Sequence, residues 1–406
     1  MNQDADWYSV LSEIIDASHL ATADELVSIL GSTCARVDIR PRLYLADIAQ
    51  RALHSVDVTH DEVLDVDATV AGRAFRLTEI LTGHDAHGAP LLWVPVLDGT
   101  ERLGVVAIGL PTDADLDDSR LRERCWTLAG LVGHLVVAKL PYSDLFHRVR
   151  RTEPLTVASE LLWQLLPPQT FACRDLVICA TMEPFNQVGG DGFDYAVDDT
   201  DAYLAVFDST GHDLCAGLIT TSVLAATRNA RRSGADLPAI AEAADTVLSR
   251  DHPTEGFATA VLATLDLSTG TLRYLLAGHP PPVLLRGGSV VKTLGVAPRL
   301  PLGLRHLRPS IGDRGLGVEY LEPGDRLLLH TDGVTEARDP EGKEFGIDRL
   351  VDLTERHEAA GLSAPETLRR ITHAVLDHQK GRLQDDATLM LVEWSTTAAN
   401  SLLPHT

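Results

Sequence analysis

The first part of the chain alternates between helical and extended patterns of apolar positions. Apolar residues in 7–30 recur at the spacing of amphipathic helices, and Thr22 is placed to begin the second of two helices. The run 90–110 consists of two β-rich stretches on either side of Asp98-Gly99, a favoured hairpin turn. An apolar helix is expected at 120–140. These patterns predict a domain of mixed helices and antiparallel strands over residues 1–141.

A different pattern follows. Residues 142–168 predict a helical connector that is broken or kinked near Pro154. From 169 to 395, short apolar strands joined by hairpin turns are interspersed with helices, which we expect near 213–232, 237–249, 346–357 and 363–378. Strands joined by hairpins pair antiparallel, so the predicted fold class is α+β, with helices that cover layered sheets. Residues 396–406 are expected to form a flexible tail.

Composition narrows the classes of function. The chain has 35 Lys and Arg against 58 Asp and Glu, a formal net charge of −23, and 45% hydrophobic residues. A nucleic-acid or anionic-membrane partner requires cationic surface, so both are disfavoured. The five cysteines include no CxxC pair, which favours reduced thiols. With no basic segment before an apolar run at the start, no signal peptide is expected, and we predict a cytoplasmic protein.

Four aspartates share one local setting. Asp191, Asp208, Asp332 and Asp385 each lie at or beside the end of an apolar run, often next to Gly or a second acid. Carboxylates gathered at strand ends repel one another unless a cation neutralises them, and hard divalent cations prefer such oxygen ligands. Each aspartate could instead be an ordinary turn residue. Their repetition in the same setting favours a metal-dependent site.

The segment from about 155 to 395 resembles the metal-dependent protein phosphatases of the phosphatase 2C-like class, in the SpoIIE/RsbU-type branch. The stretches that carry the resemblance are EPFNQVGGDGFDY, AVFDSTGHD, FATAVLATLDLSTGTLRYLLAGHPPPVLL, LEPGDRLLLHTDGVTEARDPEGKEFG and DDATLMLVEW. The resemblance implies a four-layer αββα sandwich. It also implies two Mn²⁺ or Mg²⁺ ions and hydrolysis of phosphoserine or phosphothreonine on a protein.

The resemblance assigns roles to particular residues. Asp208 would bridge both ions, and the backbone carbonyl of Ser209 would complete one coordination shell. Asp332 and Asp385 would bind one ion, and Asp191 the other, directly or through water. Asp386 would lie behind these ligands. His212 is a candidate general acid for the leaving oxygen, or a residue that satisfies a turn. His279 and Thr259 are interpreted as parts of the fold.

The chain also departs from the family pattern. The branch usually has an aromatic residue where this chain has Gly192, and glycines where it has Phe207 and Asp213. Asp213 adds negative charge beside the expected ions. The alternative function is therefore a catalytically weak or inactive phosphatase-like scaffold that binds a signalling partner.

The first domain resembles a GAF domain, a sensor of small molecules or proteins, on the stretches 67–81 and 90–110. The GAF-like domain would modulate the phosphatase in response to a small-molecule or protein signal. By resemblance, the substrate would be a phosphorylated regulator, such as a STAS-type anti-sigma factor antagonist. The helices at 120–140 and 142–168 are compatible with a homodimer contact or with a place in the core.

Overall fold

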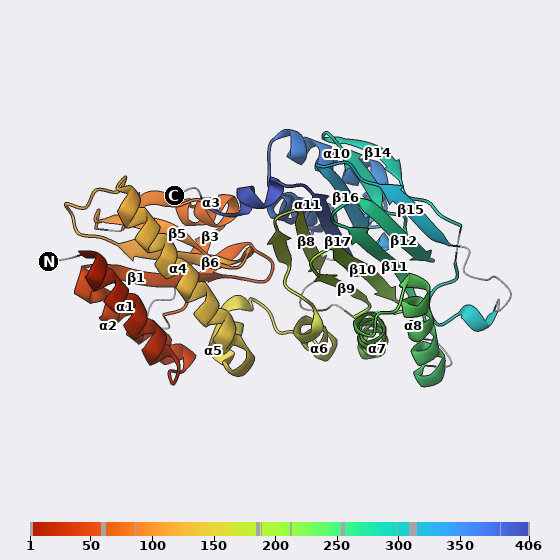
Figure 1. The fold of residues 1–406 in the computed structure, drawn as a ribbon, viewed down its shortest axis with the longest axis horizontal. Coiled ribbons are helices and arrows are strands. Elements are labelled where there is room, and N and C mark those ends of the chain that lie inside the picture. The colour runs from red at the N-terminus through yellow and green to blue at the C-terminus, as the bar shows by residue number, and fades with distance from the viewer. Residues whose placement is uncertain are drawn as a thin grey trace. The chain divides into compact units, whose positions relative to one another are not determined.

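The computed structural model describes residues 3–57, 62–85, 87–183, 187, 189–211, 213–252, 256–297, 299–307, 315–381 and 383–404. The chain divides into two compact units: Met1–Glu153 together with Asn400–Thr406, and Pro154–Ala399. Each contains its own antiparallel sheet structure and its own hydrophobic core (Figure 1). None of the helices in the described ranges combines the length and hydropathy that a bilayer-spanning segment requires.

The N-terminal unit is a six-stranded antiparallel sheet with helices on both faces. Its strand order is β3-β2-β1-β6-β5-β4. The strands are β1 (Arg40–Ala46), β2 (Ala52–Ser55), β3 (Val63–Asp65), β4 (Leu81–His84), β5 (Pro90–Asp98) and β6 (Glu101–Gly109). The helices are α1 (Gln3–Ser18), α2 (Ala23–Cys34), η1 (Ala35–Val37), α3 (Val70–Leu77), α4 (Ser119–Lys139), η2 (Leu140–Tyr142) and α5 (Asp144–Arg150). One core lies under α1, α2, α4 and α5, and a smaller one lies under α3 on the opposite face.

Local sequence signals account for these elements. Thr22 begins α2 with a capping box, in which its side chain accepts from the backbone of Glu25 and the Glu25 carboxylate accepts from the backbone of Thr22. Gly99 has φ 58° in the turn between β5 and β6, a conformation that glycine adopts without strain. The predicted helix at 120–140 and the predicted hairpin at 90–110 are both present.

The C-terminal unit contains two antiparallel sheets. The first has the order β15-β12-β11-β10-β9, and the second has the order β14-β13-β16-β17-β8-β7. The strands are β7 (Thr170–Cys173), β8 (Leu176–Glu183), β9 (Asp191–Val197), β10 (Asp201–Ser209), β11 (Ala258–Asp266), β12 (Thr271–Ala277), β13 (Val283–Arg286), β14 (Ser289–Thr293), β15 (Leu316–Tyr320), β16 (Asp325–His330) and β17 (Ala387–Trp394). The helices are α6 (Val157–Leu165), α7 (Leu214–Arg232), α8 (Leu237–Asp251), η3 (Arg305–Leu307), α9 (Asp332–Thr335), α10 (Ile347–Ala359) and α11 (Ala364–His378). The short helix η4 (Ala398–Leu402) includes residues of both units, because the division falls after Ala399.

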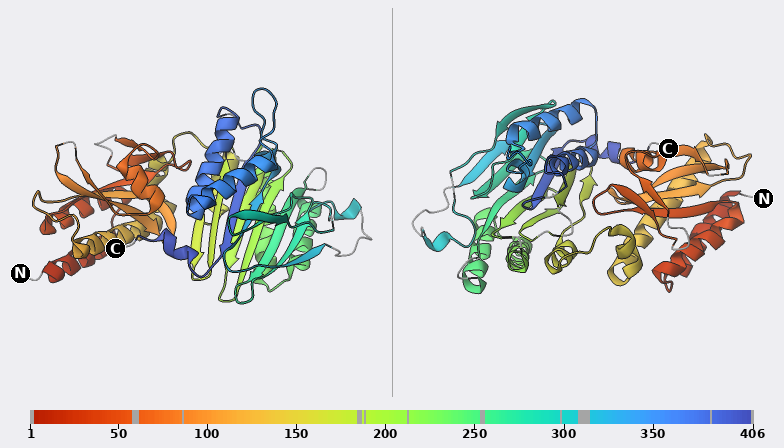
Figure 2. Two further views of the ribbon diagram at one scale, coloured as in Figure 1. Left: turned by 90° about the horizontal axis from the view of Figure 1, so that it is seen from above. Right: turned by 180° about the vertical axis from the view of Figure 1, so that it is seen from behind.

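These elements form four layers. An apolar core from both sheets lies between them. A second core joins the outer face of the first sheet to α6, α7 and α8. Helix α11 packs on β8 and β17 of the second sheet, and α10 packs on α11 (Figure 2). The predicted α+β class and αββα layering are therefore present in this unit.

The predicted connector 142–168 is distributed between the two units. Helix α5 belongs to the N-terminal unit, where Leu145 and Phe146 are buried in the core, and α6 belongs to the C-terminal unit. Pro154 lies between them, where its missing N–H interrupts no helix. Within the predicted tail 396–406, residues 398–402 form η4, and Leu402 is buried.

Candidate metal-dependent phosphatase site

Strand alternation directs a set of polar side chains into one end of the space between the two sheets. Side chains two residues apart on a strand lie on the same face of the sheet. The residues of a strand that lie in the inter-sheet core therefore show which other residues of that strand face the same space. In the first sheet, this face continues from the apolar core to Asp191, Asp208 and Thr259. In the second sheet it continues to Thr331, Asp386 and Thr388. The inter-sheet core therefore ends in carboxylates and hydroxyls.

Asp191 and Asp208 are direct neighbours across strands β9 and β10. Burial raises the pKa of Asp191 well above its ordinary value, and the negative charges of Asp208 and Asp386 add to the shift. Burial likewise raises the pKa of Asp208 to about 7, and the charges of Asp332 and Asp385 act in the same direction. The charges that act on Asp208 thus come from carboxylates that are distant from it in sequence.

Asp332 and Asp385 approach this cluster from loops that follow the sheet ends. Asp332 is the first residue of α9, directly after β16, and is half-buried. Asp385 is exposed and precedes β17. The structure thus brings together the four aspartates expected from sequence, whereas His212 lies outside the described residues.

Asp386 organises the backbone beside the cluster. Its Oδ2 atom accepts from the backbone N–H groups of Gly189, Gly190 and Asp191 at 2.9, 2.7 and 3.3 Å. Burial nevertheless raises the pKa of Asp386. One carboxylate thereby ties β17 to the segment that carries Asp191, which fits its expected place behind the ligands.

Two threonines were missed by the sequence interpretation. The Thr331 hydroxyl donates to Asp191 Oδ2 at 2.8 Å and accepts from the backbone N–H of Thr388 at 3.0 Å. Thr331 follows Leu327 and Leu329 at intervals of two residues, so it lies on the same face as they do. This spacing in the sequence could have placed Thr331 on the inter-sheet face. The hydroxyl of Thr388 is fully buried, and its hydrogen bonding to Asp191 acts against the rise in the pKa of that carboxyl group.

Ser209 is buried and adjoins a position that accepts only glycine. A Cβ atom at Gly190 would lie 2.6 Å from the Ser209 carbonyl oxygen, too close for any larger residue. The Ser209 amide donates to the Gly190 carbonyl at 3.0 Å, and the Thr220 hydroxyl donates toward the same carbonyl at 2.5 Å. The backbone expected to supply a ligand is therefore held tightly by its neighbours.

The donor set fits hard divalent cations in its chemistry. Every candidate side-chain ligand is a carboxylate, and Mg²⁺ and Mn²⁺ prefer such oxygen donors. Among the residues that the structure describes, however, no group of three or more His, Cys, Asp or Glu side chains is arranged to hold an ion. Carboxylates that repel one another approach closely when one of them is protonated or when a cation neutralises them. The fit therefore rests on donor type and mutual proximity.

The two departures from the family pattern at Gly192 and Phe207 are cross-strand neighbours. Phe207 is fully buried in the core beneath α7 and α8, on the face opposite to Asp208. A Cβ at Gly192 would meet the methyl group of Thr220 on α7 at 2.7 Å. The Phe207 ring thus packs on the helix-facing side of the sheet directly opposite a residue without a side chain.

Asp213 has a structural role at the start of α7. Its Oδ1 atom accepts from the backbone N–H groups of Cys215 and Ala216 at 2.9 and 3.1 Å. This is the N-cap arrangement, in which a carboxylate satisfies the free amides of the first helical turn. Asp213 therefore has a capping role of its own, in addition to the charge that the sequence expects it to add.

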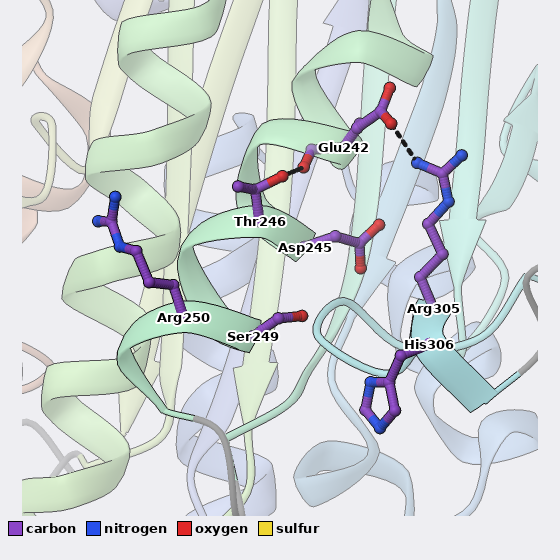
Figure 3. Close-up of a pocket in the computed structure, with 7 residues that line it drawn as sticks. All are labelled: Glu242, Asp245, Thr246, Ser249, Arg250, Arg305 and His306. Atoms are coloured by element: carbon purple, nitrogen blue, oxygen red, sulfur yellow. Dashed lines mark hydrogen bonds and ion pairs between the residues drawn. The ribbon is translucent and has the colours of Figure 1, made fainter.

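A separate surface pocket of about 630 Å³ lies between α8 and the segment around Arg305 (Figure 3). Helix α8 covers the outer face of the first sheet, whereas the aspartates lie on the inner face. The charged groups of the pocket pair with neighbours: Glu242 with Arg305 at 2.6 Å, and Asp245 with Arg299. This pocket is therefore distinct from the aspartate cluster.

Comparison with known proteins finds similarity to the C-terminal part of the chain. Residues 198–395 match the family model of stage II sporulation protein E (SpoIIE). Over 238 residues the chain is 26% identical to the phosphoserine phosphatase RsbU of Bacillus subtilis (strain 168), covering 59% of this chain and 69% of that protein. Over 143 residues it is 32% identical to protein IcfG of Synechocystis sp. (strain ATCC 27184 / PCC 6803 / Kazusa), covering 34% of this chain and only 20% of that protein.

Among solved structures, the SiaA-PP2C domain of Pseudomonas aeruginosa is 22% identical. The match covers 59% of this chain and 94% of that domain, with a TM-score of 0.48. Residues 198–395 of the C-terminal unit are therefore similar to the SpoIIE family.

Proposed function

We propose that the protein is a metal-dependent protein serine/threonine phosphatase. The observation that carries the proposal is the convergence of Asp191, Asp208, Asp332 and Asp385 at one end of the inter-sheet space. The name of the relative RsbU, a phosphoserine phosphatase, supports the same reaction class. The reaction adds water across the phosphoester bond, releasing inorganic phosphate and the free serine or threonine hydroxyl.

Two Mn²⁺ or Mg²⁺ ions, when bound, would supply an activated hydroxide and neutralise charge on the phosphoryl group. The chain's own contribution is to hold the ligands. Asp208 would bridge both ions, with Asp332 and Asp385 on one and Asp191 on the other. Thr331 orients Asp191 through its 2.8 Å hydrogen bond. His212 is proposed as the general acid that protonates the leaving oxygen.

Two observations weigh against the alternative of an inactive scaffold. That alternative rested on Phe207 and Asp213. The Phe207 ring packs on the helix-facing side of its sheet, and Asp213 caps α7. The Phe207 ring is therefore directed away from the carboxylate cluster, and the observed contacts of Asp213 are those of a helix cap.

The substrate and regulation are parts of the same proposal. We propose a phosphorylated regulator as substrate, a STAS-type anti-sigma factor antagonist in particular, because the chain is similar to RsbU. The N-terminal unit would act as a GAF-like sensor of a small-molecule or protein signal. A cytoplasmic location is in keeping with the five cysteines, all of which are free.

The decisive experiment measures Mn²⁺-dependent hydrolysis of a chromogenic phosphomonoester by the full chain. Asp208→Asn should lower turnover on the order of 100-fold or more, because both ions lose a shared ligand. Asp201→Asn is the matched control, since Asp201 is exposed at the opposite end of β10 and the same chemical change is made there. Near-normal turnover by the Asp208 variant would refute the assigned site.

Regulation requires a separate comparison. The rate of the full chain is measured against that of a fragment starting near Thr152, with candidate ligands and partners present. A signal that acts through the N-terminal unit must bind two states of the protein with different affinity, so it should change the rate of the full chain alone. Identical responses of both proteins would count against such regulation.

A further inference from the structure

Two residues that the sequence assigned to the fold, Thr259 and His279, form a hydrogen-bonded pair beside Asp208. Thr259 lies directly opposite Asp208 across β10 and β11, on the same face of the sheet. The Thr259 hydroxyl lies 2.6 Å from Nδ1 of His279. One hydroxyl therefore contacts a histidine nitrogen and belongs to the cross-strand neighbour of a candidate metal ligand.

The contact of Nε2, the second ring nitrogen of His279, determines which ring nitrogen carries the hydrogen. Nε2 of His279 lies 3.1 Å from the backbone carbonyl oxygen of His330, which can only accept. Nε2 must therefore carry a hydrogen. His279 is buried, and burial lowers its pKa to about 3, so the ring is neutral and Nδ1 carries no hydrogen. Nδ1 is consequently an acceptor.

The single hydrogen of the Thr259 hydroxyl is then committed to His279. Because a hydroxyl has one hydrogen and two lone pairs, the side of Thr259 that faces Asp208 presents lone pairs. The opposite arrangement would place the hydrogen on Nδ1 and direct the bare Nε2 lone pair at a carbonyl oxygen in a buried site. Two hydrogen-bond acceptors that face each other without a hydrogen between them are unfavourable in a buried site.

An oxygen lone pair that faces a carboxylate is repelled by it, but both are attracted to a cation placed between or beside them. A hydroxyl hydrogen in the same position would instead satisfy the carboxylate and compete with the cation. We propose that Thr259 is a positioning residue of the ion site, and that His279 orients its hydroxyl so that an oxygen lone pair, and not a hydrogen, faces Asp208. This inference rests on the proposed metal-dependent function.

The first test measures the tautomer of His279 in the unmodified full chain, by ¹⁵N chemical shifts of the imidazole nitrogens. The expected result is the neutral Nε2–H form. A neutral Nδ1–H form or a charged ring would overturn the proposal. This measurement needs no substitution and so does not depend on the folding of a variant.

The second test measures the apparent Kd for Mn²⁺ by calorimetry or electron paramagnetic resonance. Thr259→Val keeps the shape of the side chain but removes the oxygen, and should weaken binding about 10-fold, as loss of a supporting group around a metal site commonly does. Thr259→Ser should restore affinity to within about twofold. Thr264→Val, on the opposite face of β11, is the matched control. Wild-type affinity in the Thr259→Val variant would overturn the proposal.

The third test asks whether His279 acts through Thr259. His279→Leu should also weaken Mn²⁺ binding, because the freed hydroxyl can turn its hydrogen toward Asp208. In the double variant with Thr259→Val, the His279 substitution should have no further effect on affinity. A purely structural role would give additive losses and would contradict the mechanism.

The outcomes also separate this inference from the proposed function. If the wild-type chain binds no Mn²⁺, both fail. If it binds Mn²⁺ in a manner abolished by Asp208→Asn but unaffected by Thr259→Val, the phosphatase assignment stands and only the role of Thr259 and His279 is lost.

Discussion

The cross-strand pairing of Gly192 with Phe207 makes a quantitative prediction about the packing beneath α7. The two positions face each other across β9 and β10. Phe207→Gly removes a fully buried aromatic ring, which costs about 4 kcal/mol of unfolding free energy. Gly192→Phe alone forces a second ring against Phe207 and the Thr220 methyl group, at a cost of about 2 kcal/mol from overpacking. Independent effects would sum to about 6 kcal/mol.

The double variant should be less destabilised than that sum by at least about 2 kcal/mol, because a ring from β9 can occupy the space that the ring from β10 leaves. The backbone at Gly192 does not have positive φ, so its conformation does not strain a side chain, and the 2.7 Å contact with the Thr220 methyl group is the cost that remains in the double variant. Denaturant-dependent hydrogen exchange at the amides of β9 and β10 measures this domain without interference from the N-terminal unit.

A control uses a second fully buried phenylalanine. Phe193 is the neighbour of Gly192 in sequence, but its ring faces the inter-sheet core. Combining Gly192→Phe with Phe193→Gly should therefore give no rescue. The reasoning is refuted if the Gly192–Phe207 double variant loses the full sum within about 0.5 kcal/mol, since this is the tolerance for independent sites.

Three further predictions concern the site. Asp213→Ala should lower stability by about 1 kcal/mol through loss of the α7 cap while changing the Mn²⁺ affinity less than about twofold, measured by thermal unfolding and calorimetry; a large loss of affinity would place its carboxylate at the ions. Because the pKa of Asp208 is raised, this group stabilises the metal-free protein most below pH 3.8, and the contribution is lost as the pH rises through about 7. When Mn²⁺ binds near pH 6, it should therefore displace a proton from Asp208. Near pH 8.5 it should displace none from this group. Calorimetry in buffers of different ionisation enthalpy measures the release, and equal release at both pH values would contradict the shift. Gly333→Ala would place a Cβ 1.9 Å from the Asp386 carbonyl oxygen, so we expect a loss of stability above about 2 kcal/mol and weaker Mn²⁺ binding; an unperturbed melting temperature would show that the close approach is wrong.

Much of the secondary structure could be predicted because its causes are local. The hairpin at Asp98-Gly99 depends on a turn of two residues, and the start of α2 depends on Thr22 and Glu25, which are three positions apart. The candidate carboxylates were also identifiable, because acidic residues that repeatedly follow apolar strands form a pattern along the chain. These features need no knowledge of which strands become neighbours.

The partnerships around the site depend on pairing between distant segments. Strand register makes Gly192 and Phe207 cross-strand neighbours, whereas their separate departures from the family pattern had suggested impaired activity. Strand register also places Thr259 beside Asp208, and the loop after β12 brings His279 to the same hydroxyl.

The local elements, the family resemblance and the acidic residues available for chemistry could be inferred from the order of residues along the chain. The pairing of strands was needed to learn which side chains share a face and which residues are cross-strand partners. Hydrogen bonds, packing and mutual pKa shifts all depend on distances of a few ångströms. Those distances are set by strand pairing across gaps of up to about two hundred residues, as between Asp386 and Gly189.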